Sequence, residues 1–327
     1  MRRQLFIGGS GRSGTLILLN IMGTHKDIFN LPIEMRFIID PDGLIDLVDA
    51  LTVNYSPFLG REALYRFQRL MTEYLAQPGT RPYLDYNFPE WFGRDFYFKT
   101  VDEFISGLTE YEFWGSSVFE NPPAPPLNAG TDSTKETQTP AGKRKIKGAT
   151  YFPDRGLLIK KAAEFVDTLF SHAAAEKGKP IWVEKTPFNI LHAEFLWELF
   201  PEAGLIHIKR DPRAVANSLA NPAQPWAPND IRSASLFLRS TLERWFDVKK
   251  RLHLENRPYL EVKLEELVHS TPDFLQNLAN FCGVENTFPR KHRPIPEKVD
   301  YWKTQMSSQD ITIVEEVLGP YTRMMGY

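Results

Sequence analysis

The sequence predicts an α/β protein whose mainly parallel sheet is covered by helices on both faces. Two observations carry this prediction: short apolar runs that end in glycine or polar residues, and helical segments that alternate with them along the second half of the chain. A chain of 327 residues is long enough to bury a large core.

The first element is a strand, turn and helix. The run "QLFIGG" at 4–9 is apolar and stops at glycines, and "TLILLNIMGTH" at 15–25 continues with helical spacing. Residues 40–120 are predicted to form a largely helical insertion, with many aromatic residues between Tyr83 and Phe119. Residues 121–148 are rich in Pro, Thr and Gly, which favours a long mobile loop within one domain.

Strands and helices alternate after that loop. We expect strands that run into loops in 180–187 and 204–212 and a further strand in 258–267. Helices are expected in 156–178, 189–201, 213–220, 229–256 and 270–284. The helix near 271–282 is expected to begin at an N-cap Thr271 with Pro272 in its first turn, and to stop at Gly283. A closing helix begins at Ser307, with Asp310 at capping-box spacing.

Composition and charge exclude several classes of protein. Charged residues make up 24% of the chain and the net charge is −2, so we expect no nucleic-acid partner. The one cysteine, Cys282, cannot form an intramolecular disulfide and is expected to pack in the core. No run approaches the roughly 18 apolar residues of a membrane span. These features predict a soluble, cytoplasmic protein without a membrane span.

The glycine-rich loop "GGSGRSGT" at 8–15 has two interpretations. Gly9, Gly11 and Gly14 spell G-x-G-x-x-G, the fingerprint of a dinucleotide-binding fold, and Glu34 lies near the spacing of the ribose-binding acid. Pro32, just before Glu34, fits a central strand poorly.

A nucleoside-triphosphate loop is also disfavoured, because Thr15 and Leu16 occupy the positions of its lysine and its Mg²⁺-binding hydroxyl. What remains is a loop of glycine amides, a guanidinium and two hydroxyls at a helix N-terminus, which suits a phosphate. A simple packing turn between strand and helix is the alternative.

Two later stretches add cations at strand ends. Lys185, in "WVEKTPFN", lies at the carboxyl end of a predicted strand, where α/β sheets bind ligands. Arg210, in "IKRDPRAVANSL", follows another strand, and Ser218 lies eight residues further on in the next helix. Arginine offers a bidentate fork to a phosphate. A local salt bridge between Arg210 and Asp211 is the alternative.

In these three stretches the sequence resembles the sulfotransferases that use 3′-phosphoadenosine 5′-phosphosulfate (PAPS). "GGSGRSGT" is similar to their 5′-phosphosulfate loop, and "IKRDPRAVANSL" is similar to their 3′-phosphate motif. "LPIEMR" and "KTPF" are similar to motifs of the tyrosylprotein and bacterial branch. The resemblance implies a single domain over 1–327 with a P-loop-like central parallel sheet flanked by helices.

The resemblance also implies the reaction and its residues. A sulfuryl group would pass from PAPS to a hydroxyl of a carbohydrate, phenol or other small alcohol, leaving 3′,5′-bisphosphoadenosine (PAP), and no metal is expected. Glu34 would be the general base, with Lys185 and Arg12 stabilising charge. The implied donor-binding residues are Gly11, Arg12, Ser13, Gly14, Thr15, Arg210, Ser218 and Lys298, with Arg290 as an alternative to Lys298.

The sequence departs from the family pattern at Leu16, where a second threonine is usual, and this removes one phosphate hydroxyl. Glu34 has an alternative role as a carboxylate paired with Arg36, and His25 is an alternative base. The aromatic block between Tyr83 and Phe119 could line an acceptor site or simply fill the core. An NAD(P)-dependent oxidoreductase and a non-catalytic nucleotide-binding protein remain as alternative functions.

Overall fold

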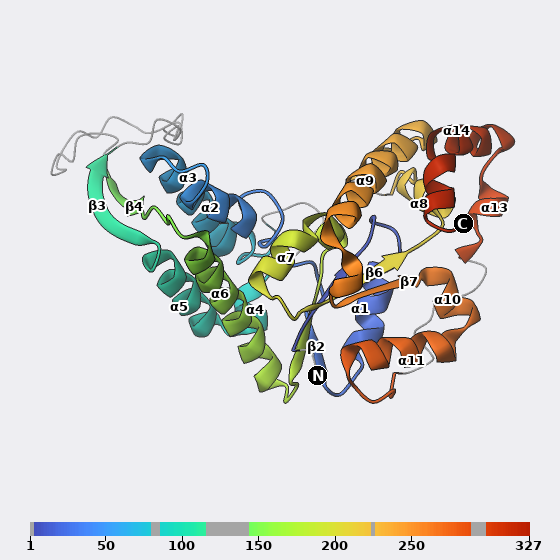
Figure 1. Ribbon diagram of the computed structural model, residues 1–327. Helices are drawn as coiled ribbons and strands as arrows, with labels where there is room; N and C mark the ends of the chain where they lie inside the picture. Colours follow the sequence, from blue (N-terminus) through green and yellow to red (C-terminus); the bar gives the residue numbers. More distant parts are fainter. Residues whose placement is uncertain (1–2, 80–85, 116–143, 224–225, 289–298) are drawn as a thin grey trace.

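The computed structural model describes residues 3–79, 86–115, 144–223, 226–288 and 299–327. Its centre is a five-stranded, all-parallel sheet in the order β2-β5-β1-β6-β7 (Figure 1). The strands are β1 (Gln4–Gly8), β2 (Ile28–Asn30), β5 (Ile181–Lys185), β6 (Gly204–Lys209) and β7 (Tyr259–Lys263). The α/β class and the parallel sheet are therefore confirmed.

Alternate residues of the central strand pack against opposite faces. On β1, Leu5 and Ile7 join one apolar cluster with helices α1 (Thr15–Gly23), α10 (Leu264–His269) and α11 (Thr271–Cys282). Phe6 joins a larger cluster on the other face, with α6 (Arg155–Glu176) and α7 (Ala193–Leu199). This period of two is what a strand covered on both faces requires.

The insertion between β2 and β5 is helical over most of its described length. It holds α2 (Leu44–Leu51), α3 (Pro57–Arg69), the π-helical turn η1 (Leu70–Tyr74), α4 (Phe88–Phe92) and α5 (Arg94–Ser106). After α5 the chain forms a two-stranded antiparallel hairpin, β3 (Thr109–Gly115) with β4 (Arg144–Ala149), which lies beside α3 (Figure 1), and α6 then leads to β5.

The hairpin corrects one predicted boundary. Residues 144–148 of the expected loop belong to β4, because backbone pairing with β3 overrides their polar, loop-like composition. Residues 121–143 of that loop lie outside the described residues.

Several aromatic residues in the described part of the aromatic block fill the core. Tyr86, Phe88, Phe92 and Tyr97 are at most 1% exposed and stack among themselves and with α6. These four side chains are therefore unavailable to an acceptor.

A third apolar cluster lies beside the sheet, over the end of β6. It is formed by α8 (Pro212–Leu219), α9 (Ile231–Leu252), α13 (Trp302–Gln305) and α14 (Ser308–Met324). The remaining turns are η2 (Pro187–His192) and η3 (Leu254–Asn256). The capping box of Ser307 and Asp310 is confirmed at the start of α14.

The start of α11 differs slightly from prediction. Its N-cap is Ser270, and Thr271 is the first helical residue, with its hydroxyl donating to the Leu267 carbonyl. Gly283 ends the helix with a left-handed φ of 71°, as predicted. In the described part of the chain, no helix is long and apolar enough to cross a membrane.

Candidate active site

The loop between β1 and α1 lies at the carboxyl edge of the sheet, where ligands bind in open α/β folds. Gly14 caps α1 at a φ of 101°, a left-handed conformation that favours glycine, and no side chain caps the helix. The first turn of α1 contains no acidic residue. Its N–H groups are therefore available to an anion.

Ser13 adds a polar group inside this loop. Its side chain is buried, and its Oγ has no hydrogen-bond partner in the described structure. A Cβ on Gly9 would collide with that Oγ and would lie 2.8 Å from the Ile208 carbonyl oxygen. A buried hydroxyl without a partner is costly unless a ligand completes it, so the loop fits a phosphate or sulfate group.

The two predicted phosphate motifs are in contact at the carboxyl ends of the neighbouring strands β1 and β6. Arg12, on the loop, donates through Nε to Ser218 Oγ on α8 at 3.0 Å. Arg210, directly after β6, donates through Nη1 to the Arg12 carbonyl oxygen at 3.3 Å. Arg12 and Arg210, which are about 200 positions apart in sequence, thus form one cluster of positive charge next to Ser218.

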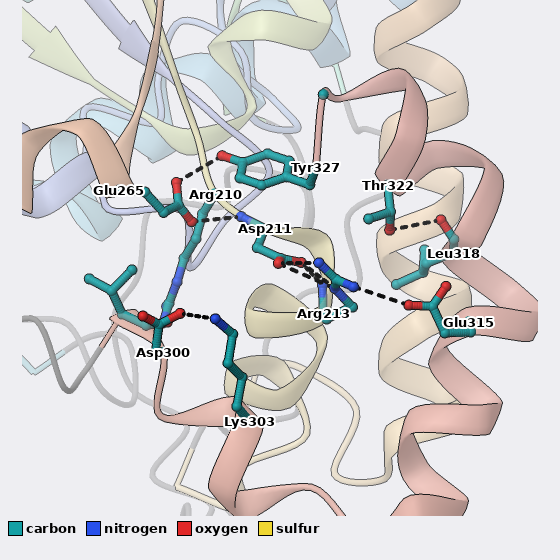
Figure 2. A network of polar contacts seen from close by, with 12 residues as sticks. Arg210, Asp211, Arg213, Glu265, Asp300, Lys303, Glu315, Leu318, Thr322 and Tyr327 are labelled. Carbon is teal, nitrogen blue, oxygen red and sulfur yellow. Dashed lines mark hydrogen bonds and ion pairs between the residues drawn. The ribbon is translucent and has the colours of Figure 1, made fainter. Parts of the chain in front are cut away.

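Asp211 is engaged by another arginine. The Arg213 guanidinium reaches both carboxylate oxygens of Asp211, at 3.0 and 2.8 Å, and also contacts Glu315 of α14 at 3.3 Å (Figure 2). Burial lowers the pKa of Arg210, an effect that the nearby Glu265 opposes. A partly buried guanidinium such as that of Arg210 gains from a bound anion.

Glu34 and Lys185 form the second part of the site. Lys185 is the last residue of β5 and its side chain is 6% exposed; its Nζ donates to Glu34 Oε1 at 2.9 Å. The other carboxylate oxygen accepts from Arg36 Nη2 at 3.2 Å. The pairing with Arg36 considered above is therefore present, and Lys185 joins it.

Some predicted residues are not brought together, or cannot be placed. Gly11 and Thr15 are buried in the loop. Among the described residues, hydrogen bonds join this loop to Arg210 and Ser218, and none joins it directly to Glu34. Lys298 and Arg290 lie outside the described residues.

His25 is not near the site. It follows the C-terminal end of α1, where its Nδ1 accepts from Asp27 N and its Nε2 lies 2.9 Å from the Glu285 carbonyl oxygen. It is 1% exposed and faces the opposite edge of the sheet from the carboxyl ends of the strands.

Sequence reasoning missed three neighbours of the site. Glu184 is a buried carboxylate next to Lys185, and Asn189 contacts it from η2. Trp226 is 51% exposed, and its ring lies 3.4 Å from where a Cβ on Gly11 would be. No local motif marks these residues, because their roles depend on contacts between separate elements.

Fold and candidate site together define a class of protein: a parallel sheet with a glycine-rich loop at its carboxyl edge, and cationic side chains from neighbouring strand ends beside that loop. A model of the sulfotransferase family matches residues 124–289, just over half of the chain. The chain belongs to this family and is an enzyme of the transferase class.

Solved structures with similar folds include two sulfotransferase domains. One is from the olefin synthase of Synechococcus PCC 7002, at 17% identity and a TM-score of 0.48, covering 96% of this chain and 94% of that one. The other is from the curacin biosynthetic pathway, at 13% identity and a TM-score of 0.48, covering 97% of each chain.

Sulfotransferase STF9 from Mycobacterium avium is also similar, at 15% identity and a TM-score of 0.43, covering 99% of this chain and 76% of that one. No curated protein sequence matches the chain.

Strand order separates this fold from a dinucleotide-binding domain. In that domain the strand after the glycine loop's helix lies next to the first strand. Here β5 lies between β1 and β2, and Glu34 follows β2 after Pro32. The oxidoreductase alternative is therefore wrong.

Proposed function

We propose that this enzyme transfers a sulfuryl group from PAPS to a hydroxyl of a carbohydrate, a phenol or another small alcohol. The observation that supports this most is the joining of two phosphate motifs through Arg12, Ser218 and Arg210. A donor with a 5′-phosphosulfate and a 3′-phosphate needs two anion sites that are fixed relative to one another, and the contacts between the two motifs support this arrangement.

The loop residues serve the 5′ side of the donor. The α1 N–H groups and the hydroxyls of Ser13 and Thr15 donate to the phosphosulfate, while Arg210 and Ser218 hold the 3′-phosphate. PAPS supplies the activated sulfuryl group, and no metal is needed where protein cations neutralise the leaving phosphate.

Glu34 acts as the general base. Its carboxylate takes the proton of the acceptor hydroxyl as the acceptor oxygen bonds to sulfur, and the bond from sulfur to the bridging phosphate oxygen breaks to release PAP. Lys185, 2.9 Å from Glu34, and Arg12 stabilise negative charge on the sulfuryl and bridging oxygens.

Calorimetric titration with PAP, NADPH and ATP–Mg²⁺ tests the donor site. We expect binding of PAP alone, and a loss of about tenfold or more in PAP affinity in Arg210→Met, since a charge-assisted hydrogen bond contributes about 1.5–3 kcal/mol. Arg232→Met, which removes an exposed arginine paired with Glu316 on the surface, is the matched control. Binding of NADPH, or equal PAP affinity in both variants, would refute the donor assignment.

Glu34→Gln tests the base. PAP formation from PAPS is followed with phenol, N-acetylglucosamine or 1-octanol, whichever the wild type uses fastest. We expect kcat to fall by about 10²- to 10⁴-fold, because the amide cannot accept the proton, while PAP affinity stays within about threefold. Turnover at the wild-type rate would mean that Glu34 is not the base. A wild type that binds PAP but transfers to no acceptor would favour a non-catalytic nucleotide-binding protein.

A further inference from the structure

Glu184 is the most deeply buried carboxylate at the edge of the site. It precedes Lys185 on β5 and is 2% exposed. Its Oε1 accepts from the Met35 backbone N–H at 3.2 Å and from Thr186 Oγ1 at 2.6 Å. Its Oε2 accepts from Asn189 Nδ2 at 2.6 Å. A carboxylate is costly to bury, so three donors converging on one carboxylate indicate a specific role.

Two consecutive residues of β5 hold two consecutive residues of the segment after β2. Glu184 holds the backbone of Met35, and Lys185 holds the carboxylate of Glu34 at 2.9 Å. Arg36, the next residue, has a φ of 56°, a left-handed conformation that is uncommon for a residue with a side chain. The short segment that carries the base therefore depends on contacts from β5 to keep its shape.

The same carboxylate is linked to the phosphate loop. Asn189 Nδ2 also donates to the Ile7 carbonyl oxygen of β1 at 3.0 Å. Two residues later, Gly9 N donates to the Pro187 carbonyl oxygen at 2.6 Å, at the start of η2. Glu184 is thus hydrogen-bonded to the base segment on one side and, through Asn189, to the strand that leads into the loop on the other.

We propose that Glu184 is a positioning residue for sulfuryl transfer, which fixes the base Glu34 and its partner Lys185 relative to the phosphate loop through Met35 and Asn189. This inference rests on the proposed function. Glu184 does not touch the reacting atoms and acts through the residues that do. Small displacements of a base from its substrate are expensive, because proton transfer needs hydrogen-bond distance.

A glutamine cannot replace this carboxylate. Its amide offers one oxygen and one NH₂ group, whereas both oxygens of Glu184 accept hydrogen bonds. If the amide oxygen faces Met35, the NH₂ group faces the donating NH₂ of Asn189. If the amide is turned over, its NH₂ faces the Met35 N–H. In either orientation two hydrogen-bond donors face each other, so one hydrogen bond is lost. The volume of the side chain is unchanged.

E184Q therefore tests the proposal with little change in packing. We expect kcat for PAP formation from PAPS, measured at about pH 8 where the Glu184 carboxyl is ionised and with the acceptor chosen above, to fall by about tenfold or more. The KM for PAPS and the affinity for PAP stay within about threefold, because the donor contacts are untouched. Amide hydrogen exchange gives a readout apart from activity: exchange at the Met35 amide accelerates, while exchange at the amide of Leu5, in β1, stays slow.

Asp167→Asn is the matched control. Asp167 on α6 accepts from Gln4 Nε2 at 2.9 Å and Trp182 Nε1 at 3.0 Å, so it also joins β1 to β5, but at the start of those strands and away from the site. Both hydrogen bonds end on Oδ1, an acceptor that asparagine keeps. We therefore expect this change of a carboxylate to an amide to leave stability nearly unchanged and kcat within about twofold of the wild type.

Three outcomes are distinguishable. A fall in kcat with faster exchange at Met35 supports the proposal. Unchanged kcat in E184Q, or equal losses in E184Q and Asp167→Asn, overturns it while the proposed function stands. A wild type that neither binds PAP nor forms it from PAPS overturns the proposed function and, with it, the role of Glu184.

Discussion

At the scale of single residues, Glu184 couples the site to pH. Burial raises the pKa of the Glu184 carboxyl to about 7 from an ordinary value of 4.5, although the hydrogen bonds from Thr186 and Asn189 oppose this rise. The folded protein therefore binds this proton more tightly than the unfolded chain does. Between these two values the contribution of Glu184 to the free energy of unfolding falls as pH rises, by about 3 kcal/mol in all.

The E184Q variant should lose this dependence. Between about pH 5 and about pH 8, we expect the wild type to lose roughly 2–3 kcal/mol of stability relative to E184Q. Comparison of the two proteins cancels the titration of all other groups, provided that these are unaffected by the change. Urea unfolding of both proteins at the two pH values measures it. A difference between the proteins that stays constant with pH would show that the carboxyl titrates at its ordinary value.

At the scale of elements, local spacing determined what the sequence could predict. The loop at 8–15, its following helix, Lys185 at a strand end and Ser218 eight residues after Arg210 all depend on residues near one another in sequence, and the structure has each of these features. The glycine at position 14 could be interpreted from the sequence, because a backbone φ of 101° favours glycine over residues with a side chain.

The pairing of strands that are distant in the chain could not be predicted from the sequence. The insertion of β5 between β1 and β2, and the strand β4 within a loop-like composition, are set by hydrogen bonds to partners far along the chain. The contact of Glu184 with Met35 spans 149 residues and has no local signature. For the same reason the sequence predicted the separate halves of the site, but not the contacts that join them.

At the scale of the whole molecule, α8 links the proposed donor site to the third apolar cluster. Its first turn follows Arg210, Ser218 lies near its end, and its inner face packs with α9 and α14. The residues after α14 return to the sheet, where Lys209 donates to the Met325 carbonyl oxygen at 3.1 Å and Lys263 to that of Gly326 at 2.8 Å. The residues that follow α14 are thereby hydrogen-bonded to the carboxyl ends of β6 and β7.

Tyr327 completes this connection, and its removal should weaken donor binding from a distance. Its hydroxyl donates to Glu265 Oε2 at 2.8 Å, and Glu265 Oε1 accepts from the Asp211 backbone N–H at 3.0 Å, directly after Arg210 (Figure 2). We expect Tyr327→Phe to lower the free energy of unfolding by about 1 kcal/mol and the affinity for PAP by about three- to tenfold, because Asp211 and Arg210 lose part of their support.

Tyr321→Phe provides the comparison. Tyr321 lies on α14, shortly before Tyr327 in the sequence, and donates to Glu243 of α9 at an exposed position, so its loss removes a similar hydrogen bond without touching Glu265. Urea unfolding and calorimetric titration with PAP on both variants separate the two effects. If Tyr327→Phe weakens PAP binding no more than Tyr321→Phe does, the contact with Glu265 stabilises the fold alone, and α8 holds Arg210 and Ser218 in place without help from the residues beyond α14.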